Sequence, residues 1–340
     1  MRTTKTTDFA EALGKYFTDY LPIQKNVSRN TIISYRDTFK SLLFYLQNEL
    51  GINVESISIS DFKSELILNF LNWLEKSKSN SIATRNQRLA AIHSFVRFCI
   101  VENPDKILEL QRILAIGPKR KIEKTIPYLT ETQVKNLLQQ PNRKSKKGRR
   151  ALTLLSLMYE TGARVQEIID LEVEDLHLEG KSPYVILTGK GRKRRKVPIS
   201  EKNRDIVLNY VQENKLDSIF NSKNPLFFNS RNEKLTRAGV GYILKKYASF
   251  ARENDCEFPK HVHNHMLRHS RAVHLLSSGT PLIVIRDLLG HSDVKTTQIY
   301  ARIEMTAKNA AVNSVSLIES EPDLKDWRMM PNLMAFLESL

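Results

Sequence analysis

Apolar positions recur at the spacing of one helix face through the first part of the chain. The pattern predicts a first helix that ends at Pro22 and a longer helix over 30–50 that follows the N-cap residue Ser28. Two more amphipathic helices are predicted over 61–76 and 81–102. Together these segments predict a helical bundle of roughly a hundred residues, which is the size of an ordinary domain.

The pattern changes near Pro118, where apolar periodicity stops and prolines appear. Residues 118–150 hold eleven basic and two acidic side chains, so we expect a basic linker followed by a new domain. Thr130 and Gln133 resemble a capping box at its first helix. Alternating residues predict a hairpin with Gly189-Lys190-Gly191 at its tip. The predicted strands cover 184–188 and 196–199. Two predicted helices cover 151–160 and 165–171. Further helices are predicted to begin near Glu201, Thr236, Leu267, Pro281 and Thr296.

Composition narrows the functional classes. The 340 residues suffice for two domains with sizeable cores, and 41% hydrophobic with 26% charged residues is typical of a globular protein. Lys and Arg outnumber Asp and Glu by 53 to 37, and the net charge of +16 favours a polyanionic partner, above all a nucleic acid. Two cysteines, Cys99 and Cys256, cannot form a disulfide framework. With no apolar run of transmembrane length and no signal peptide, we expect a cytoplasmic protein that does not bind membranes.

Four features of the second domain carry candidate chemistry. Arg164 precedes a predicted helix and can bind a phosphate with its guanidinium fork, although such an arginine is more often a surface charge. Lys190 lies in a hairpin with six basic residues in eight and can deliver a proton, because a lysine pKa can be shifted. His265 and Arg268, three apart on a helix, pair a proton carrier with a phosphate ligand. Tyr300 becomes a credible nucleophile only where a cationic pocket stabilises its phenolate.

A zinc site is the alternative interpretation of the histidines. His265 and His269 are four residues apart, a spacing that can bind zinc on one helix face. The glutamate of a His-Glu-x-x-His motif is missing, so this interpretation is disfavoured. Two arginines, a lysine and histidines, by contrast, supply the charge, acid and base that a pentacovalent phosphate needs without Mg²⁺ or ATP, so we expect no cofactor.

The sequence resembles the tyrosine recombinases, the family of phage integrases and Xer-type recombinases. Every catalytic residue type of the family occurs here in the family's order, within the segments TGARVQE, TGKGRK, HMLRH, LLGHSD and TTQIYAR. In the first domain, SRNTIISY at 28–35 is similar to the family's core-binding domain. The resemblance implies six catalytic residues and one supporting acidic residue: Arg164, Lys190, His265, Arg268, His291 and Tyr300, with Glu167 in support.

The resemblance also implies a fold and a mechanism. The chain would be mostly α, with an N-terminal helical core-binding domain (SAM-like) and a mixed α+β, mainly helical catalytic domain that holds a small β-sheet. Tyr300 would attack the scissile phosphate, forming a 3′-phosphotyrosyl bond and freeing a 5′-hydroxyl. Arg164, Arg268 and His291 would bind the phosphate, Lys190 would protonate the leaving oxygen, and His265 would take the tyrosine proton. Two such exchanges pass through a Holliday junction.

Domain limits and partners follow from the same resemblance. We expect a core-binding domain at 1–117, a basic linker at 118–128, a catalytic domain at 129–316 and a C-terminal tail with a docking helix at 317–340. The partners would be duplex DNA with paired inverted core sites, further copies of the chain as a dimer on a site and a tetramer in the synapse, and an accessory DNA-bending protein or partner recombinase. The expected DNA contacts are Lys119, Arg120, Lys121, Lys124, Arg192, Lys193, Arg194, Arg195, Arg85 and Arg88.

The chain leaves no room for an additional arm-binding domain, so we expect a simple recombinase, such as the integrase or transposase of a mobile element. Two other functions stay open. One is an architectural DNA-binding protein that has lost catalysis, although a protein that only binds DNA would not need all six catalytic residues. The other is a type IB topoisomerase-like activity, which shares the tyrosine chemistry and would relax plasmids that lack a specific site.

Overall fold

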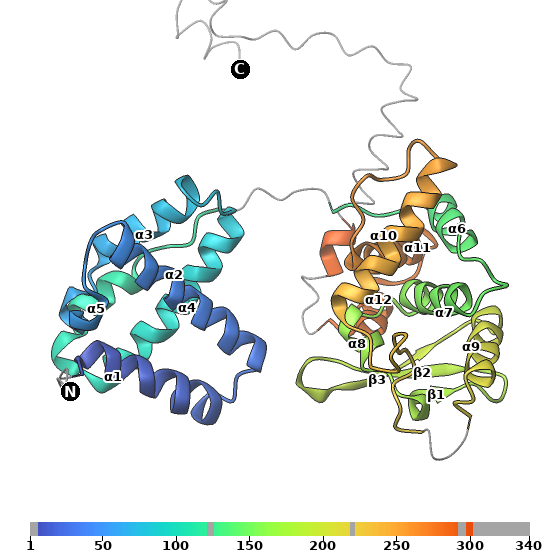
Figure 1. Ribbon diagram of the computed structural model, residues 1–340, viewed down its shortest axis with the longest axis horizontal. Helices are drawn as coiled ribbons and strands as arrows, with labels where there is room; N and C mark the ends of the chain where they lie inside the picture. Colours follow the sequence, from blue (N-terminus) through green and yellow to red (C-terminus); the bar gives the residue numbers. More distant parts are fainter. Residues whose placement is uncertain (1–5, 121–125, 218–221, 292–296, 302–340) are drawn as a thin grey trace, which may run out of the picture. The chain divides into compact units, whose positions relative to one another are not determined.

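The computed structural model describes residues 6–120, 126–217, 222–291 and 297–301. The chain divides into two compact units, Met1–Lys124 and Thr125–Leu340, and each has its own hydrophobic core (Figure 1). The finer limits of the expected linker at 118–128 stay a prediction. The expected tail at 317–340 lies outside the described residues.

The first unit is a helical bundle, as the apolar periodicity predicts. The side chains of Thr7, Ser28 and Ser81 cap helices by accepting a hydrogen bond from the backbone three residues later, which confirms Ser28 as an N-cap. A short helix near residue 110 has no counterpart in the predicted elements. The helices are α1 (Asp8–Lys15), α2 (Arg29–Asn48), α3 (Ser64–Lys76), α4 (Ile82–Glu102) and α5 (Ile107–Leu114).

The expectation that Pro22 ends the first helix is wrong. After α1 the chain continues as a π-helix, Tyr16–Gln24, which contains Pro22. The amide of Lys25 donates to the carbonyl of Tyr20, five residues back, at 2.8 Å. Tyr16 is fully buried in this segment, and burial of its ring offsets the hydrogen bond that the proline cannot donate.

Aromatic rings form the centre of the first core. Phe95 of α4 lies 5.6 Å from Phe9, 5.2 Å from Tyr16, 5.0 Å from Phe39 and 5.9 Å from Phe62, measured between ring centroids. All four pairs are edge-to-face, an arrangement that aromatic quadrupoles favour. This cluster joins α1, α2 and α4 into one body.

The second unit is mainly helical and buries one face of a small antiparallel sheet in its core, and the predicted fold class is confirmed. The capping box at Thr130 is present, and β2 pairs with β3 so that Val185 lies opposite Val197. The sheet order is β1-β2-β3, with β1 (Leu176–His177), β2 (Tyr184–Thr188) and β3 (Arg194–Pro198). The helices are α6 (Glu131–Gln139), α7 (Lys146–Thr161), α8 (Val165–Ile169), α9 (Glu201–Glu213), α10 (Arg237–Glu253), α11 (Asn264–Ser277) and α12 (Leu282–Leu289).

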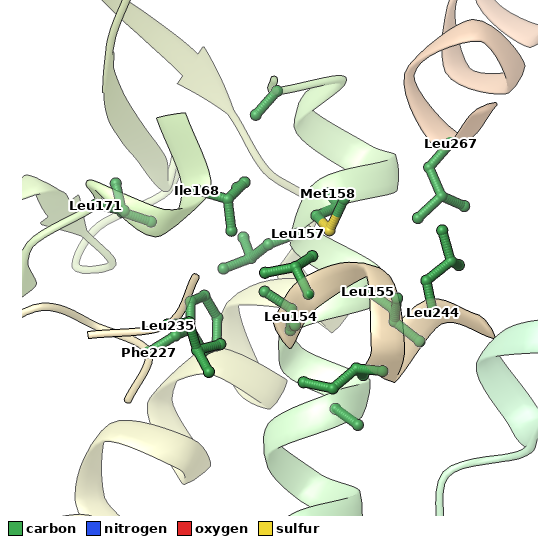
Figure 2. Packing of buried hydrophobic residues seen from close by; sticks show 14 of the residues in the cluster. Leu154, Leu155, Leu157, Met158, Ile168, Leu171, Phe227, Leu235, Leu244 and Leu267 are labelled. Atoms are coloured by element: carbon green, nitrogen blue, oxygen red, sulfur yellow. The ribbon is translucent and has the colours of Figure 1, made fainter. Parts of the chain in front are cut away.

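Helix α7 runs through the centre of this core. Its side chains Leu154, Leu155 and Leu157 are fully buried, and they pack among residues of α8, α10 and α11 such as Ile168 and Leu267 (Figure 2). Because α7 is enclosed on several sides, its C-terminal end has a fixed position. The turn that follows it, at Gly162, carries the first candidate catalytic residue.

Candidate active site

Arg164 is positioned by the tight turn between α7 and α8. Gly162 ends α7 with φ +58°, and a Cβ there would lie 2.5 Å from a methyl group of Leu289. Arg164 is the N-cap residue of α8. Its amide donates to Glu167 Oε2 at 2.8 Å and its Nη1 donates to Glu167 Oε1 at 2.9 Å. The carboxylate of Glu167 therefore orients both the backbone and the side chain of Arg164.

Glu167 also binds an arginine from the sheet. Arg195 of β3 donates to the two carboxylate oxygens at 3.1 and 2.7 Å, and its Nε donates to the carbonyl of Leu288 at 2.8 Å. Burial opposes the charge of Glu167, which is 4% exposed, but the Arg195 guanidinium outweighs it, with help from Arg164, so the pKa of this carboxyl lies below its usual value. Arg195 of β3 thus connects this strand to α8 through Glu167 and to α12 through the carbonyl of Leu288.

Arg268 is the most enclosed cation of the site. It is 3% exposed on α11, and its two Nη atoms donate to the carbonyls of Gly162 and Leu289, each at 2.7 Å. Burial lowers the pKa of this guanidinium to about 10, with a contribution from the charge of Arg164, and the group stays protonated at neutral pH. Arg268 therefore fixes the ends of α7 and α12 and holds a positive charge between them.

His291 follows α12 after a left-handed turn at Gly290, where φ is +66°. Its Nδ1 lies 2.9 Å from Thr297 Oγ1, and its ring is parallel to that of Tyr300 at a centroid distance of 6.4 Å. Burial lowers the pKa of His291 to about 4, and the charges of Arg268 and Arg164 act in the same direction. His291 is therefore neutral at pH 7 and can donate a hydrogen bond from one ring nitrogen.

Tyr300 lies in the helical segment 297–301 and is 1% exposed. Burial raises the pKa of its phenol, while Arg268 and Arg164 lower it by a smaller amount. The cationic surroundings that the sequence argument requires are thus present, but burial is the larger effect in the free protein. Tyr300 is held as a neutral phenol next to two guanidinium groups.

The histidine beside the phenol is His269. Its Nδ1 lies 2.9 Å from the Tyr300 hydroxyl oxygen. His265 is exposed at the start of α11, with its ring centroid 6.2 Å from that of His269. From the sequence, His269 is predicted only as a possible zinc ligand. Its position directly after Arg268 in the motif is the signal that could have indicated a role beside Tyr300. Within the described part of the chain, no three His, Cys, Asp or Glu side chains group as metal ligands.

An open cleft of about 930 Å³ lies beside these residues. Arg164 and His291 line it, together with Lys193 of the hairpin and Arg286 of α12. Lys190 occupies the hairpin turn at the same edge, and its side chain lies outside the described residues. Asp287 also lines the cleft and pairs with Arg286, but cations outnumber it, which favours the binding of a phosphate.

The expected DNA contacts divide into three groups. Arg120, Arg192, Lys193 and Arg194 are exposed, although Arg194 pairs with Asp175 at 2.9 Å. Lys121 and Lys124 lie outside the described residues. The others bind groups of the protein, although the side chain of Lys119 is also 46% exposed.

Arg85, for example, is 3% exposed, donates to the carbonyl of Gly117 and lies 3.4 Å from Glu75. Arg88 bonds to Thr38 and the carbonyl of Ser34 on α2. Lys119 pairs with the same Glu75 at 2.7 Å. Arg85 and Arg195 differ most from the expectation of surface contacts, because their guanidinium groups bind carbonyls and lie next to carboxylates of the protein and have little exposure to solvent.

Fold and site together define a class of enzyme. The sequence model of the phage integrase family matches residues 127–307, and that of the phage integrase N-terminal SAM-like domain matches residues 15–103. The chain belongs to the phage integrase family of tyrosine recombinases, and it is a site-specific DNA recombinase.

Individual relatives agree with this assignment. The chain is 35% identical to the integrase/recombinase y4rC of Sinorhizobium fredii, over 99% of this chain and 100% of the relative. It is 32% identical to tyrosine recombinase XerC of Bacillus subtilis, over 85% of this chain and 91% of the relative.

Two solved structures share the fold. The XerH recombinase in a post-cleavage complex with palindromic difH has a TM-score of 0.67 at 21% identity, over 86% of this chain and 82% of that one. The Tn1549 transposon integrase with transposon right end DNA has a TM-score of 0.63 at 18% identity, over 88% of this chain and 98% of that one. No helix in the described residues is long and apolar enough to cross a membrane.

Proposed function

We propose that this recombinase cuts and rejoins duplex DNA through a covalent bond between Tyr300 and a 3′-phosphate. The observation that carries the proposal is a buried phenol on which the charges of Arg268 and Arg164 act, and whose ring stacks on His291, a residue that lines a cation-rich cleft. Those charges would stabilise the phenolate and the additional negative charge of a pentacovalent phosphate. The match to the phage integrase family supports the same chemistry.

The step exchanges one phosphodiester for another. The Tyr300 oxygen forms a bond to phosphorus as the bond from phosphorus to the 5′-oxygen breaks, and Lys190 gives a proton to that leaving oxygen. Arg164, Arg268 and His291 bind the non-bridging oxygens. No net oxidation or hydrolysis occurs, so the energy of the original bond is kept for the reverse attack by a 5′-hydroxyl.

The stoichiometry of the reaction supports an assembly on DNA. One chain carries one Tyr300, whereas complete exchange between two duplexes requires four strand cleavages. Four copies would therefore act in one synapse, two on each site, with a Holliday junction after the first pair of exchanges. Paired inverted core sites, an accessory DNA-bending protein or partner recombinase, and action in the cytoplasm belong to the same proposal. The relatives described as integrases favour the recombinase of a mobile element.

Covalent trapping tests the proposal. Bound duplexes would be enriched from a fragment library, nicked next to each candidate cleavage position and incubated with the protein in EDTA. We expect an adduct that survives SDS with wild type and none with Tyr300→Phe, which retains the ring. DNA binding without an adduct at any nick position would contradict the proposal and favour an architectural protein.

A plasmid assay distinguishes site-specific recombination from a topoisomerase-like activity. A supercoiled plasmid that lacks the enriched sequence would be incubated with wild type beside one that carries two copies. We expect recombination products from the second plasmid and no relaxation of the first. Relaxation of both at equal rates would favour a topoisomerase-like activity.

A further inference from the structure

Tyr300 makes its closest polar contact with a histidine outside the six-residue catalytic set. The distance from His269 Nδ1 to the phenol oxygen is 2.9 Å, and the two ring centroids lie 5.8 Å apart. Because Tyr300 is 1% exposed, bulk water has little access to its hydroxyl group. The proton of the nucleophile therefore needs an acceptor within the protein.

His265 is less well placed for that role. It is exposed at the first turn of α11, and its ring contact is with His269. Among the residues that the structure describes, His269 is the histidine that hydrogen-bonds to Tyr300. Both residues lie on one face of α11, four positions apart, and His269 is the one directed toward the nucleophile.

The electrostatic surroundings keep His269 neutral in the free protein, where its imidazole is only weakly basic. Burial lowers its pKa to about 4, and His265, His263 and Arg268 act in the same direction. A neutral imidazole has one unprotonated nitrogen, and Nδ1 is the nitrogen that faces the phenol. A bound phosphodiester would bring a negative charge next to Arg164 and Arg268 and would make imidazolium less unfavourable during the reaction.

We propose that His269 is a catalytic residue that accepts the proton of Tyr300 during strand cleavage and returns it during rejoining. The inference rests on the proposed phosphotyrosyl mechanism and assigns to His269 the step that the sequence assigns to His265. As the bond between Tyr300 and phosphorus forms, the phenol proton passes to His269 Nδ1. The bond to the 5′-oxygen breaks at the same time, and that oxygen takes its proton from Lys190, so charge and atoms balance.

The test separates proton acceptance from positioning. His269→Ala removes both, whereas His269→Asn keeps a polar atom near the position of Nδ1 but cannot take up a proton. We expect both variants to form the adduct roughly 100-fold more slowly than wild type at saturating DNA, which is the usual effect of a general base. His261→Asn is the matched control, because His261 is exposed and is not among the groups that shift the pKa of His269.

A substrate with sulfur in place of the 5′-bridging oxygen distinguishes protonation of the leaving group from deprotonation of Tyr300. A thiolate leaves without a proton, so this substrate should rescue Lys190→Ala and leave His269→Ala slow. Rescue of His269→Ala by sulfur would place His269 at the leaving group and overturn the inference. Adduct formation by His269→Asn at the wild-type rate would show positioning alone and would also overturn it.

The hydrogen bond can be observed directly if a variant folds poorly. In protein labelled with ¹⁵N-histidine, Tyr300→Phe should shift the Nδ1 resonance of His269 and leave that of His263 unchanged. An unchanged His269 resonance would overturn the inference. If wild-type protein formed no adduct while this shift was present, the phosphotyrosyl mechanism itself would fail, which is a distinct result.

Discussion

Arg195 binds the carboxylate of Glu167 with both of its terminal nitrogens, at 3.1 and 2.7 Å. The two side chains are 14% and 4% exposed, so the ion pair is largely removed from solvent. Glu167 also holds Arg164. An arginine of the basic hairpin therefore supports the carboxylate that holds Arg164, and it also lines the cation-rich cleft.

Arg195→Ala is expected to impair cleavage more than DNA binding. The change leaves a buried carboxylate with one arginine fewer, which costs roughly 2–3 kcal/mol of folding free energy. Arg164 would lose its fixed orientation, and the rate of adduct formation should fall at least about tenfold. Thermal unfolding and single-turnover trapping measure the two effects.

Arg194→Ala is the control for this variant. Arg194 is the neighbouring residue, its side chain is 58% exposed, and its pair with Asp175 should contribute less than about 1 kcal/mol. A large loss of DNA affinity in Arg195→Ala, with unchanged stability, would contradict the buried role and restore the expected phosphate contact.

Gly290→Ala is expected to distort the same network. The backbone has φ +66° at this position, and a Cβ would lie 2.8 Å from Nη1 of Arg195. Strain and overpacking together should cost about 2–4 kcal/mol. Gly279→Ala has φ +85° and nothing within 4 Å of the new Cβ, so it measures backbone strain alone. Equal losses of unfolding free energy in both variants would show that the Arg195 side chain moves away from the new methyl group without further cost in stability.

The catalytic unit should lose stability in mild acid. The pKa values of His269 and His291 are about 4 in the folded protein, against 6.5 for an ordinary histidine. Between these values the unfolded chain binds more protons than the folded one, so stability is complete above pH 6.5 and falls as the pH drops toward 4. At pH 5 we expect a loss of about 2 kcal/mol for each histidine.

Denaturant unfolding at pH 7 and pH 5 measures this loss. His269→Asn, which cannot titrate, should show a smaller difference between the two pH values than wild type does. The same difference in both proteins would assign the acid sensitivity to other groups.

The exposed end of the hairpin should contribute to the salt dependence of DNA binding. Lys193 is exposed and lines the cation-rich cleft. Lys193→Ala should reduce the slope of log Kd against log salt by about 0.9 if the lysine neutralises one phosphate. Lys202 is exposed at the start of α9 and does not line the cleft, so Lys202→Ala should leave the slope unchanged. Equal slopes for wild type and Lys193→Ala would remove Lys193 from the DNA contacts.

Much of the secondary structure could be predicted because it depends on neighbouring residues. The apolar period and the N-cap Ser28 are enough to place α2, and alternation places β2 at Tyr184–Thr188. The exceptions depend on more distant contacts. Pro22 stays inside a helix because aromatic rings of other segments bury Tyr16, and no local rule contains that information.

The sequence alone determined the class of protein, since ordered motifs with Arg164, Lys190, His265, Arg268, His291 and Tyr300 indicate one chemistry. Only the tertiary structure decided which cations face solvent and which histidine meets Tyr300. Arg195 is largely removed from solvent, and the carbonyl of Leu288, 93 residues later, accepts its Nε–H. His269 meets Tyr300 across 31 residues. A local sequence pattern reports charge and period, whereas burial and hydrogen bonding depend on segments that are adjacent only in the folded chain.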